Sequence, residues 1–205
     1  MITSKLSLIG SGGHAVVLID MMKLLGIDID NLYDDNYSNK ACKNIEVISP
    51  IDFNIPENAI IAVGDNLVRR KLSIKSKNKN WWKLVHPSAI ISRDVNVGQG
   101  TVIMAGSIIQ TGVIIGEHSI INSGACIDHD CDIGSFAHLS PNVSIAGGVC
   151  IGEGTHIGIG ACVINGITIG KWVTIGAGAV VIKPVPDYAV VVGNPGRVIK
   201  FNNYE

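Results

Sequence analysis

The sequence has few aromatic and few charged residues, and it lacks long runs of basic or apolar residues. Phe, Trp and Tyr make up 5% of the 205 residues, and Asp, Glu, Lys and Arg make up 16%, with a net charge of −1. Because no basic run occurs, nucleic acid is not an expected partner. No apolar run approaches the ~20 residues that a membrane-spanning helix requires, so we expect no membrane span.

Two further absences concern the cellular compartment. The first ten residues are too short and too polar a stretch to predict a secretory signal peptide. The cysteines form no CxxC pair and their number is odd, so reduced thiols are the simplest interpretation. Together these features predict a cytoplasmic protein. The five cysteines are Cys42, Cys126, Cys131, Cys150 and Cys162.

Helical periodicity is also lacking over residues 91–181, where a repeat of six residues takes its place. From Ile91 to Val181 every sixth residue is Ile, Val or Leu. The residue two positions earlier is small or β-branched, which is the period-two pattern of a strand with one face turned inward. Each hexad then turns a corner, and glycine accepts the unusual backbone angles of a corner. A longer period of eighteen residues is marked by Gly98, Gly116, Gly134, Gly152 and Gly170.

Three hexads make one coil of eighteen residues with three short, flat faces. A single coil cannot bury its inward face, whereas stacked coils hydrogen-bond to one another and share a core. The repeat therefore predicts a parallel β-helix of about five coils. The period does not determine the hand of this helix.

The residues before the repeat alternate between strand and helix patterns. This alternation predicts a small Rossmann-like α/β domain. We expect two domains, the α/β domain over residues 1–85 and the β-helix with a C-terminal extension over residues 86–205. The predicted strands are 5–9, 29–33, 46–48, 59–63 and 189–192, and the predicted helices are 15–25 and 67–77.

A glycine-rich turn, Gly10-Ser-Gly-Gly-His14, joins the first predicted strand to the first predicted helix. Its spacing matches the glycine fingerprint of dinucleotide-binding turns, with acidic residues about 20 positions later. The region up to residue 85 is, however, too short for a complete six-stranded dinucleotide domain. Backbone N–H groups at a helix N-terminus suit phosphate groups of any ligand.

These features together resemble one family. The glycine turn, the segment Tyr33-Asp34-Asp35, the uninterrupted hexapeptide repeat and the segment Ile127-Asp-His-Asp-Cys131 are similar to the PglD/NeuD-like sugar-nucleotide acetyltransferases over essentially the whole chain. The resemblance implies a left-handed β-helix, a homotrimer with active sites between subunits, and acetyl-CoA as co-substrate without a metal. It also implies N-acetylation of the 4-amino group of a UDP-linked 4-amino-4,6-dideoxy sugar, as in bacillosamine-type pathways. Other members acetylate sialic acid or related sugars, so an O-acetyltransferase is the alternative.

The resemblance assigns the chemistry to three residues. His129 would be the general base, Asp130 would raise its basicity, and Asn122 would lie beside the sugar amine. Histidine suits this role because its pKa lies near neutral pH. Adjacent residues of a strand point to opposite sides, so contact between His129 and Asp130 requires a bend at the corner.

The resemblance also assigns the binding of both substrates. The carboxylates after the second strand would meet the uracil, whose N3–H a carboxylate can accept, although they could also form a solvated turn. The N–H of Gly147 would stabilise the tetrahedral oxyanion, and His138 would meet the acetyl group. Lys183, Arg197 or Lys200 could meet the coenzyme phosphates or be solvated surface charges. The expected nucleotide-sugar residues are Gly12, Gly13, His14, Asp34, Asp35 and Gly64, and the expected coenzyme residues are His138, Gly147, Ile159 and Ala177.

The remaining histidines have structural interpretations. His86 precedes a proline and is expected to be a linker residue, and His118 is expected on the outer surface. His138 and His156 are eighteen residues apart, so we expect them to point outward and to stack on neighbouring coils about 5 Å apart.

Two other functions remain open. The β-helical zinc carbonic anhydrases share the predicted fold, and His138, His156 and a neighbouring subunit's His129 could hold a metal ion. Those enzymes resemble one another in a histidine pair five residues apart, and no two histidines here have that spacing. A non-catalytic scaffold is the other possibility, and the combined Gly-Gly-His turn and Asp-His-Asp segment argue against it.

Overall fold

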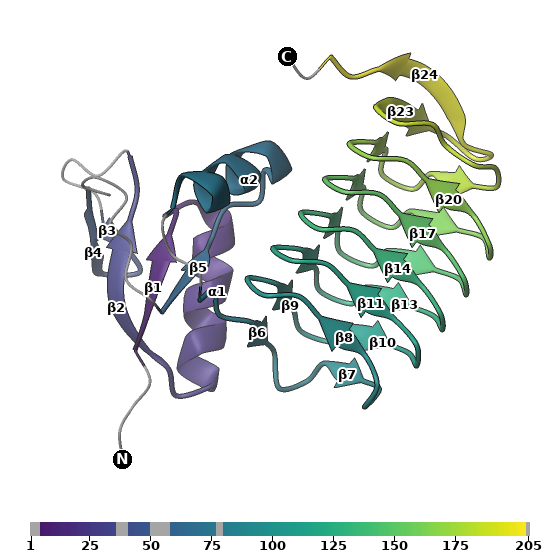
Figure 1. Cartoon of the computed structure of the whole chain (residues 1–205). Coiled ribbons are helices and arrows are strands. Elements are labelled where there is room, and N and C mark those ends of the chain that lie inside the picture. The colour runs from purple at the N-terminus through teal and green to yellow at the C-terminus, as the bar shows by residue number, and fades with distance from the viewer. Residues whose placement is uncertain (1–4, 36–40, 50–57, 77–79, 204–205) are drawn as a thin grey trace. The chain divides into compact units, whose positions relative to one another are not determined.

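The structure is a computed structural model that describes residues 5–35, 41–49, 58–76 and 80–203. The chain divides into two compact units, Met1–Lys83 and Leu84–Glu205. The first unit contains a small sheet with two helices, and the second is a stack of triangular coils (Figure 1).

The first unit is a five-stranded sheet in the order β3-β4-β2-β1-β5. All of its pairs are parallel except β3 with β4, and β3 is a strand that the sequence patterns did not predict. Four of the five residues of β1 are buried, as in a parallel sheet that is covered on both faces. The elements are β1 (Lys5–Ile9), α1 (Gly13–Leu24), β2 (Asp28–Tyr33), β3 (Ala41–Cys42), β4 (Ile45–Ile48), β5 (Ala59–Ile61) and α2 (Asn66–Lys75).

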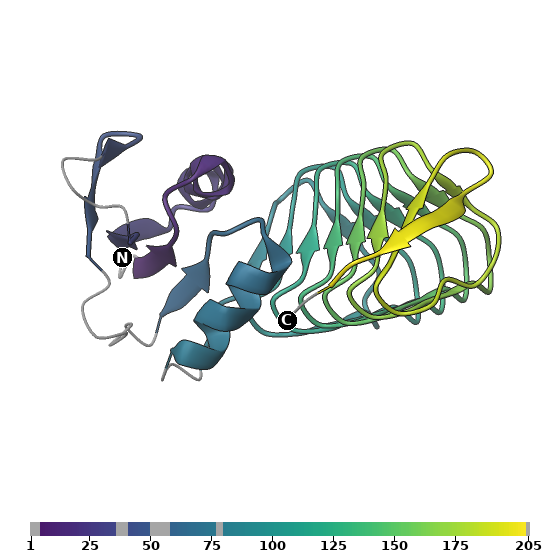
Figure 2. The ribbon, with the colours of Figure 1, turned by 90° about the horizontal axis from the view of Figure 1, so that it is seen from above.

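The second unit is a parallel β-helix with three faces, which the chain visits in the order A, B, C. The coils stack regularly in two perpendicular views (Figures 1 and 2). Face A contains β6 (Leu84–Val85), β9 (Val102–Ile103), β12 (Ile120–Ile121), β15 (His138–Leu139), β18 (His156–Ile157), β21 (Thr174–Ile175) and β23 (Ala189–Val192). Face B contains β7 (Ile90–Ile91), β10 (Ile108–Ile109), β13 (Cys126–Ile127), β16 (Ser144–Ile145), β19 (Cys162–Val163) and β22 (Val180–Val181). Face C contains β8 (Asn96–Val97), β11 (Ile114–Ile115), β14 (Asp132–Ile133), β17 (Cys150–Ile151) and β20 (Thr168–Ile169).

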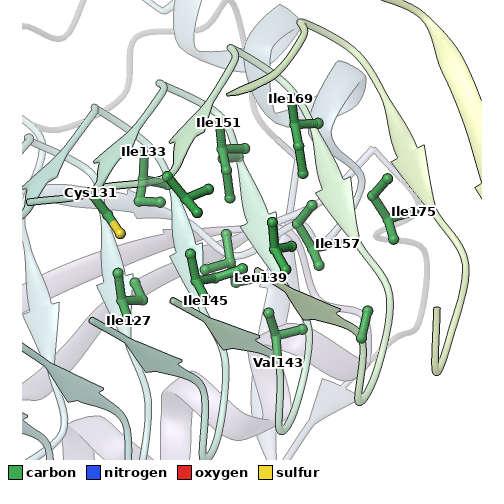
Figure 3. Packing of buried hydrophobic residues seen from close by; sticks show 14 of the residues in the cluster. Ile127, Cys131, Ile133, Leu139, Val143, Ile145, Ile151, Ile157, Ile169 and Ile175 are labelled. Carbon is green, nitrogen blue, oxygen red and sulfur yellow. The ribbon is translucent and has the colours of Figure 1, made fainter. Parts of the chain in front are cut away.

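The inward positions of each hexad form one continuous core, as the six-residue period predicted. Ile127, Ile133 and Leu139 are fully buried, and so are Ala125 and Ala137 two positions before an inward residue. Figure 3 shows these branched side chains filling the space inside the coils. Each coil alone would leave this surface in water, so burial between coils stabilises the stack by roughly 25 cal/mol per Å² of apolar area.

The β-helix is longer than predicted. Strand pairing begins at β6, before Ile91, and continues through β23, beyond Val181. The count of about five coils is therefore too low. Val85 continues the six-residue spacing before Ile91. At the other end, Thr174 pairs with Val190, so this coil leaves the hexad pattern but stays in the stack. A final strand, β24 (Arg197–Phe201), pairs antiparallel with β23 and was not predicted.

Glycines have two different roles in the coils. The third residue after an inward position has a left-handed backbone, as at Gly124 and Gly166 (φ +68° in both), or at Asn142 (φ +58°). The glycines that recur every eighteen residues lie instead at the end of face C and allow successive coils to approach closely. A Cβ atom at Gly152 would lie 2.5 Å from the carbonyl carbon of Gly170.

We predict that Gly152→Ala destabilises the β-helix by about 1–3 kcal/mol, because the added carbon meets backbone that cannot move aside without separating two coils. Gly166→Asn is the matched control, since no atom lies within 4 Å of its Cβ position and asparagine accepts a left-handed backbone. Urea unfolding followed by circular dichroism measures both effects. Equal midpoints for the two variants would contradict this assignment of roles.

Candidate active site

His129 and Asp130 lie at the corner between faces B and C, directly after β13. Asp130 has φ +58°, and this left-handed residue supplies the bend that contact between adjacent side chains requires. The Nδ1 atom of His129 lies 2.8 Å from Oδ2 of Asp130. This hydrogen bond and the negative charge of Asp128 raise the pKa of His129 above its ordinary value. With Nδ1 donating to the carboxylate, Nε2 is the nitrogen that can accept a proton.

Gly147 lies one coil further along the same corner, beside the ring of His129. A Cβ atom at Gly147 would be 2.6 Å from Nε2 of His129, so only glycine leaves room for the ring. The N–H of Gly148 donates to the carbonyl of His129 at 2.9 Å and fixes the spacing of the two coils. The structure thus brings together three of the predicted residues: His129, Asp130 and Gly147.

A second cluster of polar side chains lies on face A and at the adjoining corner between faces A and B. Nδ2 of Asn122 donates to Nε2 of His138 at 3.1 Å, and the hydroxyl of Ser140 lies 2.8 Å from Nε2 of His156. The two histidine rings stack with their centroids 5.0 Å apart, which confirms the predicted stacking. Asn122 is held from its other side by the N–H of Ser123.

The predicted surface position of His118 is wrong. Its side chain is 3% exposed at the corner between faces C and A. The left-handed backbone there (φ +53°) turns the ring onto Gly100 of the preceding coil, and Phe136 stacks on its other side with centroids 5.3 Å apart. His86, by contrast, makes local contacts with the N–H and hydroxyl of Ser88.

The predicted coenzyme residues divide between two corners. Ile159 and Ala177 are exposed at the corner between faces A and B, on the side of Asn122 and His138, whereas Gly147 lies with His129. Lys183 and Arg197 line a hollow of about 250 Å³ near the C-terminal end of the coils, together with apolar side chains. Lys200 is not among the residues that line this hollow.

In the first unit, the glycine turn leads into α1. Gly12 is the N-cap residue, has an extended backbone and offers no side chain to the first-turn N–H groups. No atom lies within 4 Å of the Cβ positions of Gly12 and Gly13, so packing within the chain does not require glycine at either position. Bare glycines at a helix N-terminus let an anionic ligand approach the backbone closely.

A buried arginine donates hydrogen bonds to the loop that follows β5. Arg69 is 1% exposed and donates to the carbonyls of Val63 (3.1 Å) and Gly64 (3.0 Å) and to the side chain of Asn66 (2.8 Å). Burial, together with the charge of Arg69, lowers the pKa of His14 to about 4, so this histidine is neutral at pH 7. Sequence reasoning missed Arg69, and its position four residues after the helix cap Asp65 is the one signal that could have found it.

The carboxylates after β2 have different surroundings. Oδ2 of Asp34 accepts hydrogen bonds from the N–H (2.7 Å) and the hydroxyl (2.6 Å) of Ser11, which ties the glycine turn to the end of β2. Asp35 is exposed. Gly64 is not among the residues that line the adjacent hollow. Its carbonyl accepts a hydrogen bond from Arg69. This hollow of about 130 Å³ is lined by Ile9, Gly10, Asp34, Asp35, Val63, Val68 and Leu72.

Within residues 5–35, 41–49, 58–76 and 80–203, no three His, Cys, Asp or Glu side chains lie close enough together to hold a metal ion. Neither helix in these ranges is long and apolar enough to cross a membrane.

Two family models match separate parts of the chain. The PglD N-terminal domain matches residues 5–75, and the bacterial transferase hexapeptide (six repeats) matches residues 94–129. A mutant of the perosamine N-acetyltransferase of Caulobacter crescentus, solved in complex with CoA and GDP-perosamine, is 34% identical over 98% of both chains, with a TM-score of 0.90. The chain belongs to the PglD-like family of hexapeptide-repeat acetyltransferases. The hexapeptide match also indicates that the β-helix is left-handed.

Other relatives match over different lengths. The acetyltransferase domain of PglB from Neisseria gonorrhoeae, in complex with acetyl coenzyme A, is 34% identical over 96% of this chain and 100% of that chain, with a TM-score of 0.88. The UDP-N-acetylbacillosamine N-acetyltransferase of Bacillus subtilis is 37% identical over 109 residues, which is 50% of its length. An uncharacterized protein of Acanthamoeba polyphaga mimivirus is 36% identical over 99 residues, which is 20% of its length. The matches therefore span half or less of these two curated relatives.

We predict that Asp130→Asn lowers the pKa of His129, because the hydrogen bond to Asp130 is the largest cause of its elevation. Asp128→Asn, which removes only the second cause, should lower this pKa less. Titration of the His129 ring signals by NMR measures both changes without any substrate. An unchanged midpoint in Asp130→Asn would contradict the contact between the two side chains.

Proposed function

We propose that the protein is an acetyl-CoA-dependent N-acetyltransferase that acts on the 4-amino group of a UDP-linked 4-amino-4,6-dideoxy sugar of the bacillosamine type. The observation that carries this proposal is the hydrogen bond between Nδ1 of His129 and Asp130. This bond raises the pKa of the His129 imidazole and leaves its Nε2 atom able to accept a proton. Similarity over nearly the whole chain to one structure that contains CoA and GDP-perosamine, and to another that contains acetyl coenzyme A, supports it.

In the proposed reaction, the sugar amine attacks the thioester carbonyl while Nε2 of His129 takes the proton that the amine loses. The C–N bond forms, and the N–H of Gly147 stabilises the tetrahedral oxyanion. The C–S bond then breaks, and the imidazolium returns the proton to the sulfur of CoA. Asn122 positions the amine and His138 meets the acetyl group. The acetyl group passes directly from sulfur to nitrogen.

The first unit supports recognition of the nucleotide. The first turn of α1 would bind the diphosphate at Gly12, Gly13 and His14, and the hollow beside Asp34 and Asp35 would receive the base. A carboxylate can accept the N3–H of uracil, but it can also accept the N1–H and amino group of guanine. Since the Caulobacter relative contains GDP-perosamine, the choice of nucleotide is part of the test.

The active unit in this proposal is a cytoplasmic homotrimer with its sites between subunits. The support comes from the position of the predicted residues. His129, Asp130 and Gly147 lie at one corner of the β-helix, and Asn122 and His138 lie at another. A second subunit is the simplest way to bring these two groups together.

The proposed activity is tested by thiol release from acetyl-CoA with a panel of acceptors. The panel contains UDP- and GDP-linked 4-amino-4,6-dideoxy sugars and their 4-hydroxy counterparts. We expect turnover with the amino sugars, highest with UDP. Turnover with the hydroxy sugars alone would favour an O-acetyltransferase, and no thiol release with any acceptor would overturn the proposal.

His129→Ala should lower kcat by roughly 10²–10⁴-fold, the usual contribution of a general base, while both KM values stay near those of the wild type. Asp130→Ala should cost less, because the base itself remains. His138→Ala should act mainly on the KM for acetyl-CoA.

Steady-state kinetics on each variant, with trimer state and thermal stability checked, measures this order. The assignment of the base is wrong if folded, trimeric His129→Ala keeps more than about a tenth of wild-type activity.

A further inference from the structure

The carbonyl that precedes Gly147 accepts a hydrogen bond from inside the β-helix. The thiol sulfur of Cys131 lies 3.3 Å from the carbonyl oxygen of Ala146 and 3.7 Å from that of His129. Cys131 is 1% exposed, and Figure 3 shows its sulfur among the side chains of the core. Burial raises the pKa of this thiol, so at neutral pH it keeps the hydrogen that it donates to the nearer carbonyl.

The residues stacked with Cys131 at steps of eighteen are all apolar. Val113 and Val149, in the coils on either side, are fully buried and have no side-chain donor. Packing of the core therefore does not require a thiol at this position. What distinguishes Cys131 from its neighbours is the hydrogen of the thiol, which a valine of similar volume lacks. The apolar members of the column are Val95, Val113, Val149, Ile167 and Val185.

The direction of the Ala146 carbonyl also sets the direction of the next N–H. In a trans peptide group the C=O and N–H bonds point to opposite sides. Because this carbonyl accepts from a thiol in the core, the N–H of Gly147, which belongs to the same peptide group, points away from the core. The side chain of His129, which is 57% exposed, lies outside the core as well.

The same arrangement occurs at Asn122, with one difference. The hydroxyl of Ser107 donates to the carbonyl of Asn122 at 3.0 Å, from fifteen residues earlier in the chain, as Cys131 does to Ala146. The N–H of Ser123 then donates to Oδ1 of Asn122 at 2.8 Å. At that corner, a side-chain acceptor thus caps the N–H that follows the fixed carbonyl.

The N–H of Gly147 has no such cap. One coil earlier at the same corner, the N–H of His129 donates to Oδ1 of Asp128 at 2.8 Å. Ala146 stands eighteen residues after Asp128, and its methyl group offers no acceptor. Among residues 80–203, no backbone carbonyl accepts a hydrogen bond from the N–H of Gly147. This donor is therefore oriented from inside the coil and left open on the outside.

We propose that Cys131 is a positioning residue for an oxyanion donor at Gly147, and that Ala146 keeps this donor open because it has no side-chain acceptor. The inference rests on the proposed acetyl transfer, in which the N–H of Gly147 meets the oxyanion. A donor that is already aimed at the oxyanion stabilises the transition state without reorganisation. Cys131 acts through the peptide group, since its buried side chain lies beneath the corner and not beside the reacting atoms.

Two substitutions at Cys131 separate positioning from packing. Cys131→Ser keeps a donor, as Ser107 does at the same position of its hexad, but places a hydroxyl in apolar surroundings. Cys131→Val removes the donor and matches Val113 and Val149. We expect Cys131→Val to be the more stable variant and yet to have the lower kcat, by about two- to tenfold, the effect of one weak hydrogen bond. Equal kcat values, or kcat values that follow thermal stability, would overturn the proposal.

Two substitutions at Ala146 test whether the donor must stay open. Ala146→Asn adds an amide that can cap the N–H of Gly147, as Asn122 caps Ser123, whereas Ala146→Leu adds similar bulk without an acceptor. Ala146→Asn should have a kcat about 10²-fold below that of Ala146→Leu, the usual cost of losing one oxyanion donor. A kcat for Ala146→Asn equal to or above that of Ala146→Leu would contradict the proposal.

NMR measures the same peptide group without any substrate. Hydrogen exchange of the Gly147 amide should be slower in Ala146→Asn than in Ala146→Leu. The chemical shift of the Ala146 carbonyl carbon should change more in Cys131→Val than in Cys131→Ser. These changes in a protein that transfers no acetyl group would support the oriented peptide and remove the proposed activity. Acetyl transfer by variants in which neither signal responds would leave the activity standing and overturn the positioning.

Discussion

The fixed advance of eighteen residues per coil is the constraint on which the second unit depends. Each coil buries two positions per hexad, so an inserted or deleted residue would turn the next inward side chains outward. Because the advance is fixed, residues eighteen apart stack on one another, as His138 does on His156 and His129 does beside Gly147. Side chains eighteen residues apart therefore form columns along each face and each corner. In the proposed function, the column at one corner supplies half of each site, and the column at another corner supplies the other half from another copy.

The first unit is held by different forces. A buried cation, Arg69, satisfies two loop carbonyls, and Ser11 ties the glycine turn to Asp34 at the end of β2. Buried polar contacts of this kind cost free energy when one partner is removed, because the other is left unsatisfied. They fix the loops that surround the hollow beside Asp34 and Asp35, whereas the β-helix fixes its site residues by repetition. In the proposed function, the first unit recognises the nucleotide and the second unit transfers the acetyl group.

The sequence alone predicted the elements that follow from a period. The hexad repeat gave the β-helix and its core, and the eighteen-residue spacing gave the stacked pair of His138 and His156. The contact between His129 and Asp130 could be anticipated only as a requirement for a bend, which the left-handed backbone of Asp130 supplies. The burial of His118 could not be predicted, because it depends on the shape of a corner and on Phe136 in the next coil. Arg69 was missed because two of its three hydrogen-bond partners are backbone carbonyls, which residue types do not reveal.

Mixed trimers measure most directly whether one site is shared by two copies. His129→Ala and the double variant Asn122→Ala/His138→Ala are differently tagged, co-expressed in equal amounts and assayed beside each parent. In a shared site, each mixed ring regains one intact site of three, so random assortment restores about a quarter of wild-type activity from two inactive parents. Mixed trimers no more active than either parent would show that each site is built within one chain, and would contradict the account.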